Sequence, residues 1–360
     1  MLLAMILPFS WQLPAHAAMI NETTEEMADR PAAVLSLPCE EDRALPSLCP
    51  GGMVFGIHVR TPGVLIVGLC DLGEGAKESP AAQAGLRVGD IITEIDGHAV
   101  HSANDLLALL RTCNGDRIAV VYRRGDETRQ VQLQPHYAVN ENTHRIGVRV
   151  KDSAAGLGTV TYVDPRTGEF GGLGHGICDG ESGALLPVQR GLTTGAVVRS
   201  VVPGKAGTPG ELRGTLLAQK TGTLIANTPC GVFGVFAGIP TTPEAALPVA
   251  PAAQVHAGEA YIWSTVDGGA PMRYTVTLSD LHPGTDSKNF TVHVTDPVLL
   301  QKTGGIVQGM SGSPIVQGGR LVGAVTHVMI NDPATGYGIF LENMLRAADD
   351  SMRQIGKQAS

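Results

Sequence analysis

The sequence predicts a mainly β protein with two folded domains. A chain of 360 residues has room for two domains. Its 46 glycines and 23 prolines, set against only 4% aromatic residues, indicate many short strands and turns with Val, Ile and Leu in the core. From residue 140 onward, apolar runs recur about every ten residues between turn signals, which favours a β sandwich or a pair of β barrels. Residues 340–353 are the one helix predicted there.

Composition narrows the classes of partner and cofactor. The net charge is -8 and no Lys/Arg-rich run is present, so we predict that nucleic acid is not a partner. The six cysteines are scattered and no Cys-x-x-Cys or His-x-x-x-His spacing indicates zinc. We therefore predict no metal and no cofactor. Cys39 and Cys49 are the pair that an oxidising compartment would join.

The N-terminus indicates export. Residues 1–18 hold an apolar run followed by Ala-His-Ala-Ala, which predicts a signal peptide or a truncated membrane anchor and contact with a membrane surface. No Lys or Arg precedes that run, and a disordered tail is the alternative. Residues 19–49 are polar, acidic and interrupted by proline, so a linker is expected.

Residues 50–135 predict a small domain of several strands and two helices. Ser-Pro-Ala-Ala-x-Ala-Gly-Leu (79–86) predicts a capped helix ended by glycine, and Gly-Asp-x-Ile followed by Ile-Asp-Gly (89–97) predicts a strand and tight turn. Ser102 begins an amphipathic helix. The segment resembles the PDZ domains attached to bacterial proteases. By resemblance, a peptide would add as a strand beside the loop Met53, Val54, Phe55 and Gly56; a spacer domain is the alternative.

Residues 305–314, Gly-Ile-Val-Gln-Gly-Met-Ser-Gly-Ser-Pro, contain the candidate nucleophile, Ser311. A serine hydroxyl needs a base and donors for the oxyanion. The backbone amides of Gly309, Met310 and Ser311 are the expected oxyanion hole, because glycine lets the chain turn sharply there. A plain β-turn is the alternative, and Ser313 is the alternative nucleophile.

His175 is the candidate base. It lies in Gly-Gly-Leu-Gly-His-Gly, which leaves the imidazole accessible at a strand end. Its interval to Ser311 suits two consecutive six-stranded barrels that each supply one partner. His327, on the strand predicted after Ser311, is the rival base, with a structural role expected beneath the site.

Asp296 is the candidate orienting carboxylate. No aspartate lies between Glu181 and Val266, where a chymotrypsin-like protease would supply one, so the carboxylate must come from elsewhere. Asp296 follows a predicted strand shortly before Ser311. Asp-Pro at a strand end is also ordinary turn chemistry.

Together these blocks resemble the SpoIVB peptidases of endospore-forming bacteria, from about residue 50 to the C-terminus. The resemblance implies residues 140–360 as a chymotrypsin-like double-barrel serine endopeptidase with His175, Asp296 and Ser311 as its triad. It further implies export to the space between forespore and mother-cell membranes, and cleavage of a membrane-associated regulator of an intramembrane protease. The PDZ domain would bind a peptide, including the chain's own N-terminal segment. A catalytically silent PDZ adaptor and a general quality-control protease are the alternatives.

Overall fold

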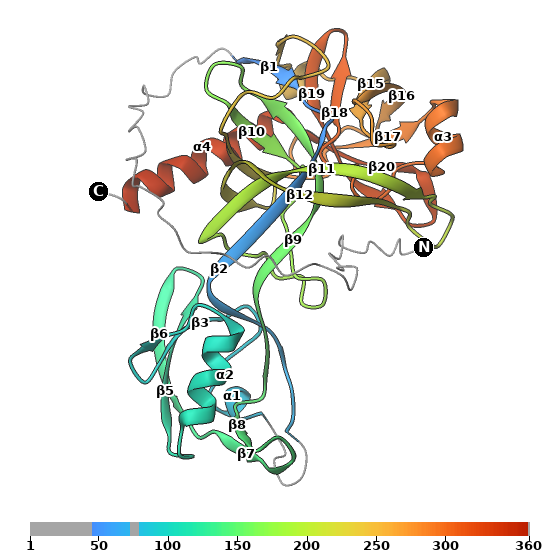
Figure 1. Cartoon of the computed structure of the whole chain (residues 1–360). Helices are drawn as coiled ribbons and strands as arrows, with labels where there is room; N and C mark the ends of the chain where they lie inside the picture. The colour runs from blue at the N-terminus through green and yellow to red at the C-terminus, as the bar shows by residue number, and fades with distance from the viewer. Residues whose placement is uncertain (1–44, 73–78, 359–360) are drawn as a thin grey trace.

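The computed structural model describes residues 45–72 and 79–358 (Figure 1). Six strands close into a first barrel through the pairings β9–β10, β10–β13, β13–β12, β12–β11, β11–β2 and β2–β9. Its core contains Phe55, Val160 and Phe170. The strands are β2 (Val54–Leu69), β9 (Val148–Val163), β10 (Glu169–Gly172), β11 (Arg190–Val202), β12 (Glu211–Thr228) and β13 (Gly231–Phe236).

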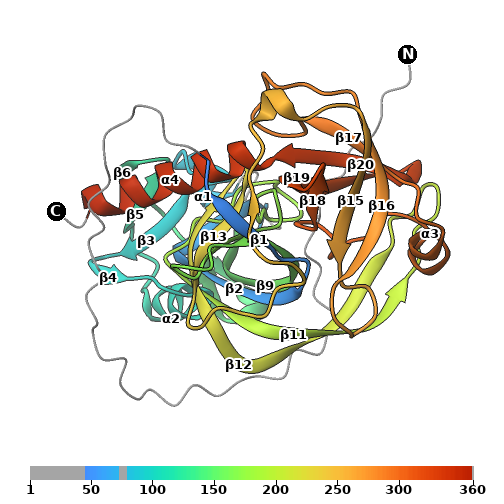
Figure 2. The same cartoon turned by 90° about the horizontal axis from the view of Figure 1, so that it is seen from above.

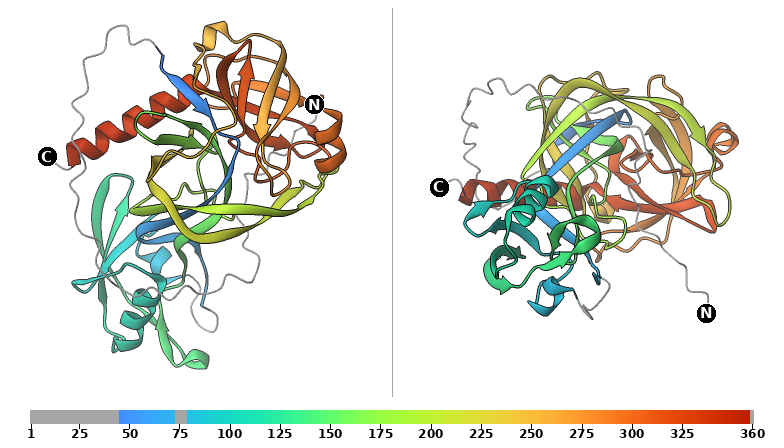
Figure 3. Two further views of the ribbon diagram at one scale, coloured as in Figure 1. Left: turned by 45° about the horizontal axis from the view of Figure 1, so that its top comes forward. Right: turned by 60° about the horizontal axis from the view of Figure 1, so that its bottom comes forward.

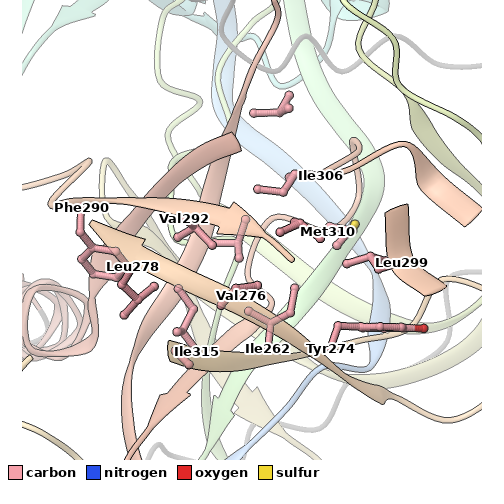
Figure 4. Packing of buried hydrophobic residues seen from close by; sticks show 14 of the residues in the cluster. Ile262, Tyr274, Val276, Leu278, Phe290, Val292, Leu299, Ile306, Met310 and Ile315 are labelled. Carbon is pink, nitrogen blue, oxygen red and sulfur yellow. The ribbon is translucent and has the colours of Figure 1, made fainter. Parts of the chain in front are cut away.

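A second closed barrel follows in the sequence. Along β16, Tyr274, Val276 and Leu278 are buried at every second position, as expected when one face of a strand lines a core. Figure 4 shows Met310 and Ile306 among the residues of this core. The strands are β15 (Gly258–Ser264), β16 (Met272–Ser279), β17 (Phe290–Val294), β18 (Pro314–Gln317), β19 (Arg320–Met329) and β20 (Asp332–Phe340). The predicted mainly β architecture is confirmed.

The PDZ unit has its own core of residues such as Val64, Leu106 and Leu110. Ser79 and Ser102 cap its two helices, because each side-chain oxygen accepts a backbone N–H from the first turn. Besides the distal parts of β2 and β9, its elements are α1 (Pro80–Gln83), β3 (Ile91–Ile95), β4 (His98–Ala99), α2 (Ala103–Thr112), β5 (Ile118–Arg124), β6 (Glu127–Leu133), β7 (His136–Ala138), the short 3-10 helix Val139–Glu141 and β8 (Thr143–Arg145).

Strands β2 and β9 run through both the first barrel and the PDZ unit. They pair from Val54↔Thr159 to Arg60↔Ser153 in the barrel, and again from Leu65↔Lys151 to Leu69↔Val148 in the PDZ unit. The PDZ unit is thus inserted between two paired barrel strands. Figure 3 shows it and the second barrel on opposite sides of the first barrel. The domain boundary expected at residue 50 therefore shifts, because residues 54–60 belong to the peptidase barrel.

The predicted PDZ loop, Met53 to Gly56, is wrong as a peptide site. Phe55 is buried against Phe170, with ring centroids 5.7 Å apart. The carbonyl of Met53 accepts the N–H of Val160, and Gly56 pairs with Thr194 of β11. These contacts occupy both edges of the segment, so a peptide cannot add beside it.

The remaining elements frame the barrels. Helix α4 (Leu341–Gln358) confirms the helix predicted at the C-terminus and continues directly from β20 (Figure 2). Its Leu341 and Met344 belong to the same buried cluster as Phe233. None of the helices within the described ranges is both long and apolar enough to cross a membrane. The others are β1 (Ser47–Pro50), β14 (Leu247–Pro248), the 3-10 helix Ala252–Gln254 and α3 (Pro297–Thr303).

Three sequence predictions concern the N-terminal region: the signal or anchor segment, the linker and the pairing of Cys39 with Cys49. The signal or anchor segment, most of the linker and Cys39 lie outside the described residues. Cys49 is buried in β1, where it pairs with Val163 of β9. Strand β1 therefore joins the peptidase sheet, although the sequence assigned part of it to the linker.

Candidate active site

The loop that carries Ser311 is anchored from both barrels. Gly309 and Gly312 have φ of +97° and +96°, which L side chains rarely adopt, so glycine is needed at both positions. The side chain of Met310 is fully buried in the second core and holds the turn. Ser313 is also fully buried, and its hydroxyl lies 3.0 Å from that of Ser264. Ser313 is therefore placed inside the barrel rather than at the site.

Two backbone amides of this loop have no acceptor among the described residues and are the candidates for an oxyanion hole. The carbonyl of Gln308 accepts from Leu212 N at 2.8 Å, and that of Met310 accepts from Ser313 N at 2.9 Å. Because N–H and C=O point in opposite directions across a trans peptide, the amides of Gly309 and Ser311 point away from these partners. Neither donates to another group in the described part of the chain.

Met310 does not belong to this set. Its amide donates to the carbonyl of Val307 at 3.1 Å, so the predicted oxyanion hole loses its middle member. The amides of Gly309, Met310 and Ser311 alternate in direction because successive peptide planes in the turn face opposite sides. The N–H of the plane between Gly309 and Met310 points into the turn, toward Val307. Two donors, from Gly309 and Ser311, remain.

His175 follows a strained turn. The amide of Gly174 donates to the carbonyl of Gly172 at 2.8 Å, and the intervening Leu173 has φ of +67°. This is a γ-turn with positive φ, a rare conformation that costs energy and tends to occur at functional sites. The turn directs His175 out of β10 toward the second barrel, where Gly174 packs on Thr326 and Ile339.

The ring of His175 is held in a defined tautomer. Its Nδ1 lies 2.9 Å from the carbonyl oxygen of Gly176, which can only accept, so Nδ1 carries the proton. The other nitrogen, Nε2, is then the basic one. Burial of the ring lowers the pKa of His175 below its ordinary value, partly offset by the bond to Gly176. A neutral imidazole with a basic Nε2 is the form that a general base requires.

Ser311 and His175 meet at Thr326 and His327. The Ser311 hydroxyl donates to the carbonyl oxygen of Thr326 at 2.6 Å. The ring of His175 packs on that of His327, with centroids 4.9 Å apart. Two segments far apart in the sequence thus converge on one dipeptide of β19. Both predicted residues are buried, with exposed fractions of 3% for Ser311 and 7% for His175. The expectation that the His175 imidazole is accessible at a strand end is therefore wrong, because the ring packs on His327 of the second barrel.

His327 has properties unsuited to a base. Burial first, then the charges of His175 and Lys288, lowers the pKa of His327 to about 3. It is therefore neutral and weakly basic at ordinary pH. This agrees with a supporting role beneath the site rather than with proton transfer.

Asp296 is not brought to His175. Its carboxylate caps α3 by accepting from Val298 N and Leu299 N at 2.9 and 3.0 Å, and it also accepts from Thr275 N. Asp296 lies beyond the end of β17, whereas the ring of His175 packs on His327, which is level with residues 291–292 of that strand. Four or five strand residues separate Asp296 from that level, roughly 13–17 Å. The predicted triad is corrected: the carbonyl of Gly176, not Asp296, contacts Nδ1 of His175.

One residue of the site escaped the sequence analysis. Thr159 of β9 is fully buried; its hydroxyl donates to the carbonyl of Gly309 at 2.7 Å and its N–H to that of Ser311 at 3.2 Å. The only signal in the sequence is a pair of threonines, Thr159 and Thr161, inside an otherwise apolar run. Strands tolerate threonine well, so that signal alone points to no function.

Comparison with known families identifies the larger unit. The model of the SpoIVB peptidase S55 family matches residues 142–345, more than half of the chain. The chain belongs to this family. A PDZ domain model matches residues 73–124. The S55 match and the site agree on a serine peptidase, which confirms the predicted class of enzyme.

Curated relatives match over a smaller part. A Bartonella henselae protein named as a zinc metalloprotease is 35% identical over 94 residues, which cover 26% of this chain and 25% of that protein. A similarly named Clostridium acetobutylicum protein is 27% identical over 29% of this chain and 27% of its own. The chain thus spans about a quarter of these relatives. Within the described ranges, no group of three or more His, Cys, Asp and Glu side chains could hold a metal ion.

Solved structures match each unit separately. The PDZ domain of the SdrC-like protein from Listeria monocytogenes covers 25% of this chain and 87% of its own, at 29% identity and a TM-score of 0.22. The Rv3671c protease from M. tuberculosis covers 53% of this chain and 72% of its own, at 13% identity and a TM-score of 0.32.

Proposed function

We propose that this S55 peptidase is an endopeptidase in which Ser311 is the nucleophile and His175 the base. The observation that carries the proposal is their convergence on Thr326 and His327, beside two amides that have no acceptor in the described chain. Acyl transfer requires a nucleophile, a base and oxyanion donors together.

The reaction begins with a rotation of the Ser311 side chain. Its hydroxyl leaves the carbonyl of Thr326 and turns to Nε2 of His175, which takes the proton as Oγ bonds to the substrate carbonyl carbon. The amides of Gly309 and Ser311 hold the resulting oxyanion. His175 then gives the proton to the leaving amine as the C–N bond breaks. Water, deprotonated by the same imidazole, releases the acyl group and restores Ser311.

Labelling with a fluorophosphonate tests this assignment. Wild type and Ser313→Ala should be labelled and should cleave a peptide substrate, because the Ser313 hydroxyl is engaged with Ser264 inside the barrel. Ser311→Ala should lose both activities while its thermal unfolding is unchanged. Labelling retained in Ser311→Ala would overturn the proposal, and a wild type without labelling would favour the silent adaptor.

The PDZ unit is proposed to capture an extended peptide at β9 rather than at β2. Residues 148–151 of β9 pair with β2 on one edge, while α2 lies along the other side. The amides of Ile146 and Gly147, just before this edge, donate to no group within the described residues, and their carbonyls are held by the Ser79 hydroxyl. A free carboxylate on those amides and a strand beside β9 would complete the sheet.

Peptide binding can be measured by fluorescence anisotropy. A peptide with a free C-terminus should bind more tightly than its amidated form. Leu109→Lys, on the half-buried face of α2, should abolish binding, whereas Val139→Lys at an exposed position of the same unit should not. Equal binding of the two peptide forms would remove the carboxylate from the proposal.

The biological substrate is proposed from the family alone. We propose cleavage of a membrane-associated regulator of an intramembrane protease, in the space between forespore and mother-cell membranes, and self-cleavage between residues 18 and 50. N-terminal sequencing of the exported wild type and of Ser311→Ala tests self-cleavage, since identical ends would exclude it. Expression outside sporulation would instead favour general quality control.

A further inference from the structure

Thr159 connects two parts of the site through three hydrogen bonds. From the first barrel, its hydroxyl reaches the carbonyl of Gly309 and its N–H reaches that of Ser311. Its own carbonyl accepts the N–H of Leu173 at 3.2 Å, in the turn that precedes His175. A single buried residue therefore touches the loop of the nucleophile twice and the segment of the base once.

The hydrogen bond from the Thr159 hydroxyl to Gly309 is made to a peptide plane that lies between the two candidate oxyanion donors. The Gly309 carbonyl belongs to the peptide plane between the planes that carry the Gly309 and Ser311 amides. Gly309 has φ of +97°, and a glycine backbone can adopt many other conformations. Contacts from outside the loop are therefore needed to keep the peptide planes on either side of Gly309 in place. Leu212 holds one of those planes from outside the loop and Thr159 holds the plane between them. Preorganisation of donors is what makes an oxyanion hole effective.

We propose that Thr159 is a positioning residue for catalysis, whose hydroxyl fixes Gly309 so that the amides of Gly309 and Ser311 converge on the oxyanion. The role rests on the proposed function of Ser311. Thr159 touches no substrate atom. Its removal should impair stabilisation of the tetrahedral intermediate and leave ground-state binding of the peptide intact.

Thr161 provides a matched control. It lies two residues further along β9, is fully buried, and donates its hydroxyl to the carbonyl of Gly312 at 2.8 Å. The Gly312 carbonyl belongs to a peptide plane beyond both oxyanion donors. Thr→Val at either position removes one buried hydroxyl from the same strand and changes the shape little. A merely structural role predicts the same outcome for both.

The experiment compares Thr159→Val, Thr159→Ser and Thr161→Val by kcat, KM and the affinity for a peptide boronate, which forms a tetrahedral adduct. Thr159→Val should lose about tenfold to a hundredfold in kcat and in boronate affinity with KM unchanged, less than the loss on removing a donor outright. Thr159→Ser retains the hydroxyl and should stay within about threefold of wild type, as should Thr161→Val. Thermal unfolding should shift equally in the two valine variants.

Three results would overturn the role: equal kcat in Thr159→Val and Thr161→Val, a rise in KM alone, or no rescue in Thr159→Ser. If Thr159→Val does not fold, Thr159→Ala replaces it with the same expectations. Absence of Ser311-dependent cleavage in the wild type would overturn the proposed function and this role with it. Wild-type cleavage with indistinguishable variants would overturn this role alone.

Discussion

The imidazole rings of His175 and His327 pack with centroids 4.9 Å apart and planes inclined by 40°. The base thus has a neutral aromatic neighbour, and its Nδ1–H is held by a backbone carbonyl. A carbonyl fixes the tautomer as a carboxylate would, but it lacks the full negative charge that stabilises an imidazolium. The first consequence concerns pH.

Activity should persist below the ordinary pKa of histidine. Burial lowers the pKa of His175, and the neutral ring is the active form. The acid limb of kcat/KM should therefore lie below pH 6.5, and activity should be lost only as pH falls through that lower value. A pH profile with a substrate that does not titrate in this range measures it. An acid limb above 6.5 would indicate a carboxylate partner and contradict the geometry.

His327 should make the fold sensitive to acid. Its folded pKa of about 3 lies below the unfolded value of 6.5, so the unfolded chain binds more protons between these values. The stabilising contribution is complete above pH 6.5 and is lost as pH falls toward 3. His327→Asn should reduce this slope in plots of unfolding free energy against pH. His293→Asn, at an exposed position of β17, is the control for replacing a histidine elsewhere in the same barrel.

Asp296 should behave as a helix cap. Asp296→Ala should cost about 1 kcal/mol in unfolding free energy, because α3 loses its N-cap, and Asp296→Asn should cost less. Both variants should keep activity within about tenfold of wild type, whereas loss of a triad aspartate costs about 10,000-fold. Denaturant unfolding and kcat measurements on these two variants distinguish a helix-capping role of Asp296 from a triad role. A severe loss of activity in a stable Asp296→Asn would restore the triad.

Gly312 should tolerate no side chain. A Cβ there would lie 2.1 Å from the carbonyl oxygen of Thr159 and 2.5 Å from the N of Leu173, both backbone atoms that cannot move aside cheaply. Gly312→Ala should lose activity and about 3 kcal/mol or more of stability. Gly319→Ala is the matched control: its φ is also positive, but no atom lies within 4 Å, so only the cost of a left-handed backbone, roughly 1–2 kcal/mol, is expected. Similar losses would contradict the close approach of the barrels.

The sequence predicted the features that are encoded locally. Glycines around Ser311 and His175 have local conformational causes, and the helix cap at Ser79 is a short motif. The interval between His175 and Ser311 suits two consecutive six-stranded barrels, and it predicted that each barrel supplies one of the two residues. The S55 resemblance supplied the class of enzyme.

Features that depend on distant pairing were missed. Residues 53–56 have the composition of a PDZ loop, but their environment is set by β9 and β11, about 100 residues or more further along the chain. The role of Asp296 could have been predicted from the sequence. An Asp directly before Pro, with Leu-Leu two residues further on, is typical of an N-cap followed by proline in the first turn of a helix. The position of Asp296 shortly before Ser311 in the sequence favoured a triad role instead. Thr159 could not be found because only the assembled barrels bring it to Gly309.

The pairing of Arg60 with Ser153 has an architectural consequence. Paired residues in antiparallel strands lie about 5 Å apart, a gap that a two-residue turn spans. Residues 61–152 therefore occupy the position of a hairpin turn between β2 and β9. Replacing them with Asn-Gly would leave the first barrel closed. The hydrogen bonds between β9 and the Ser311 loop would be retained. The enzyme can be described as a peptidase that carries its recognition module as an enlarged turn, so modules with similarly spaced ends should be interchangeable there.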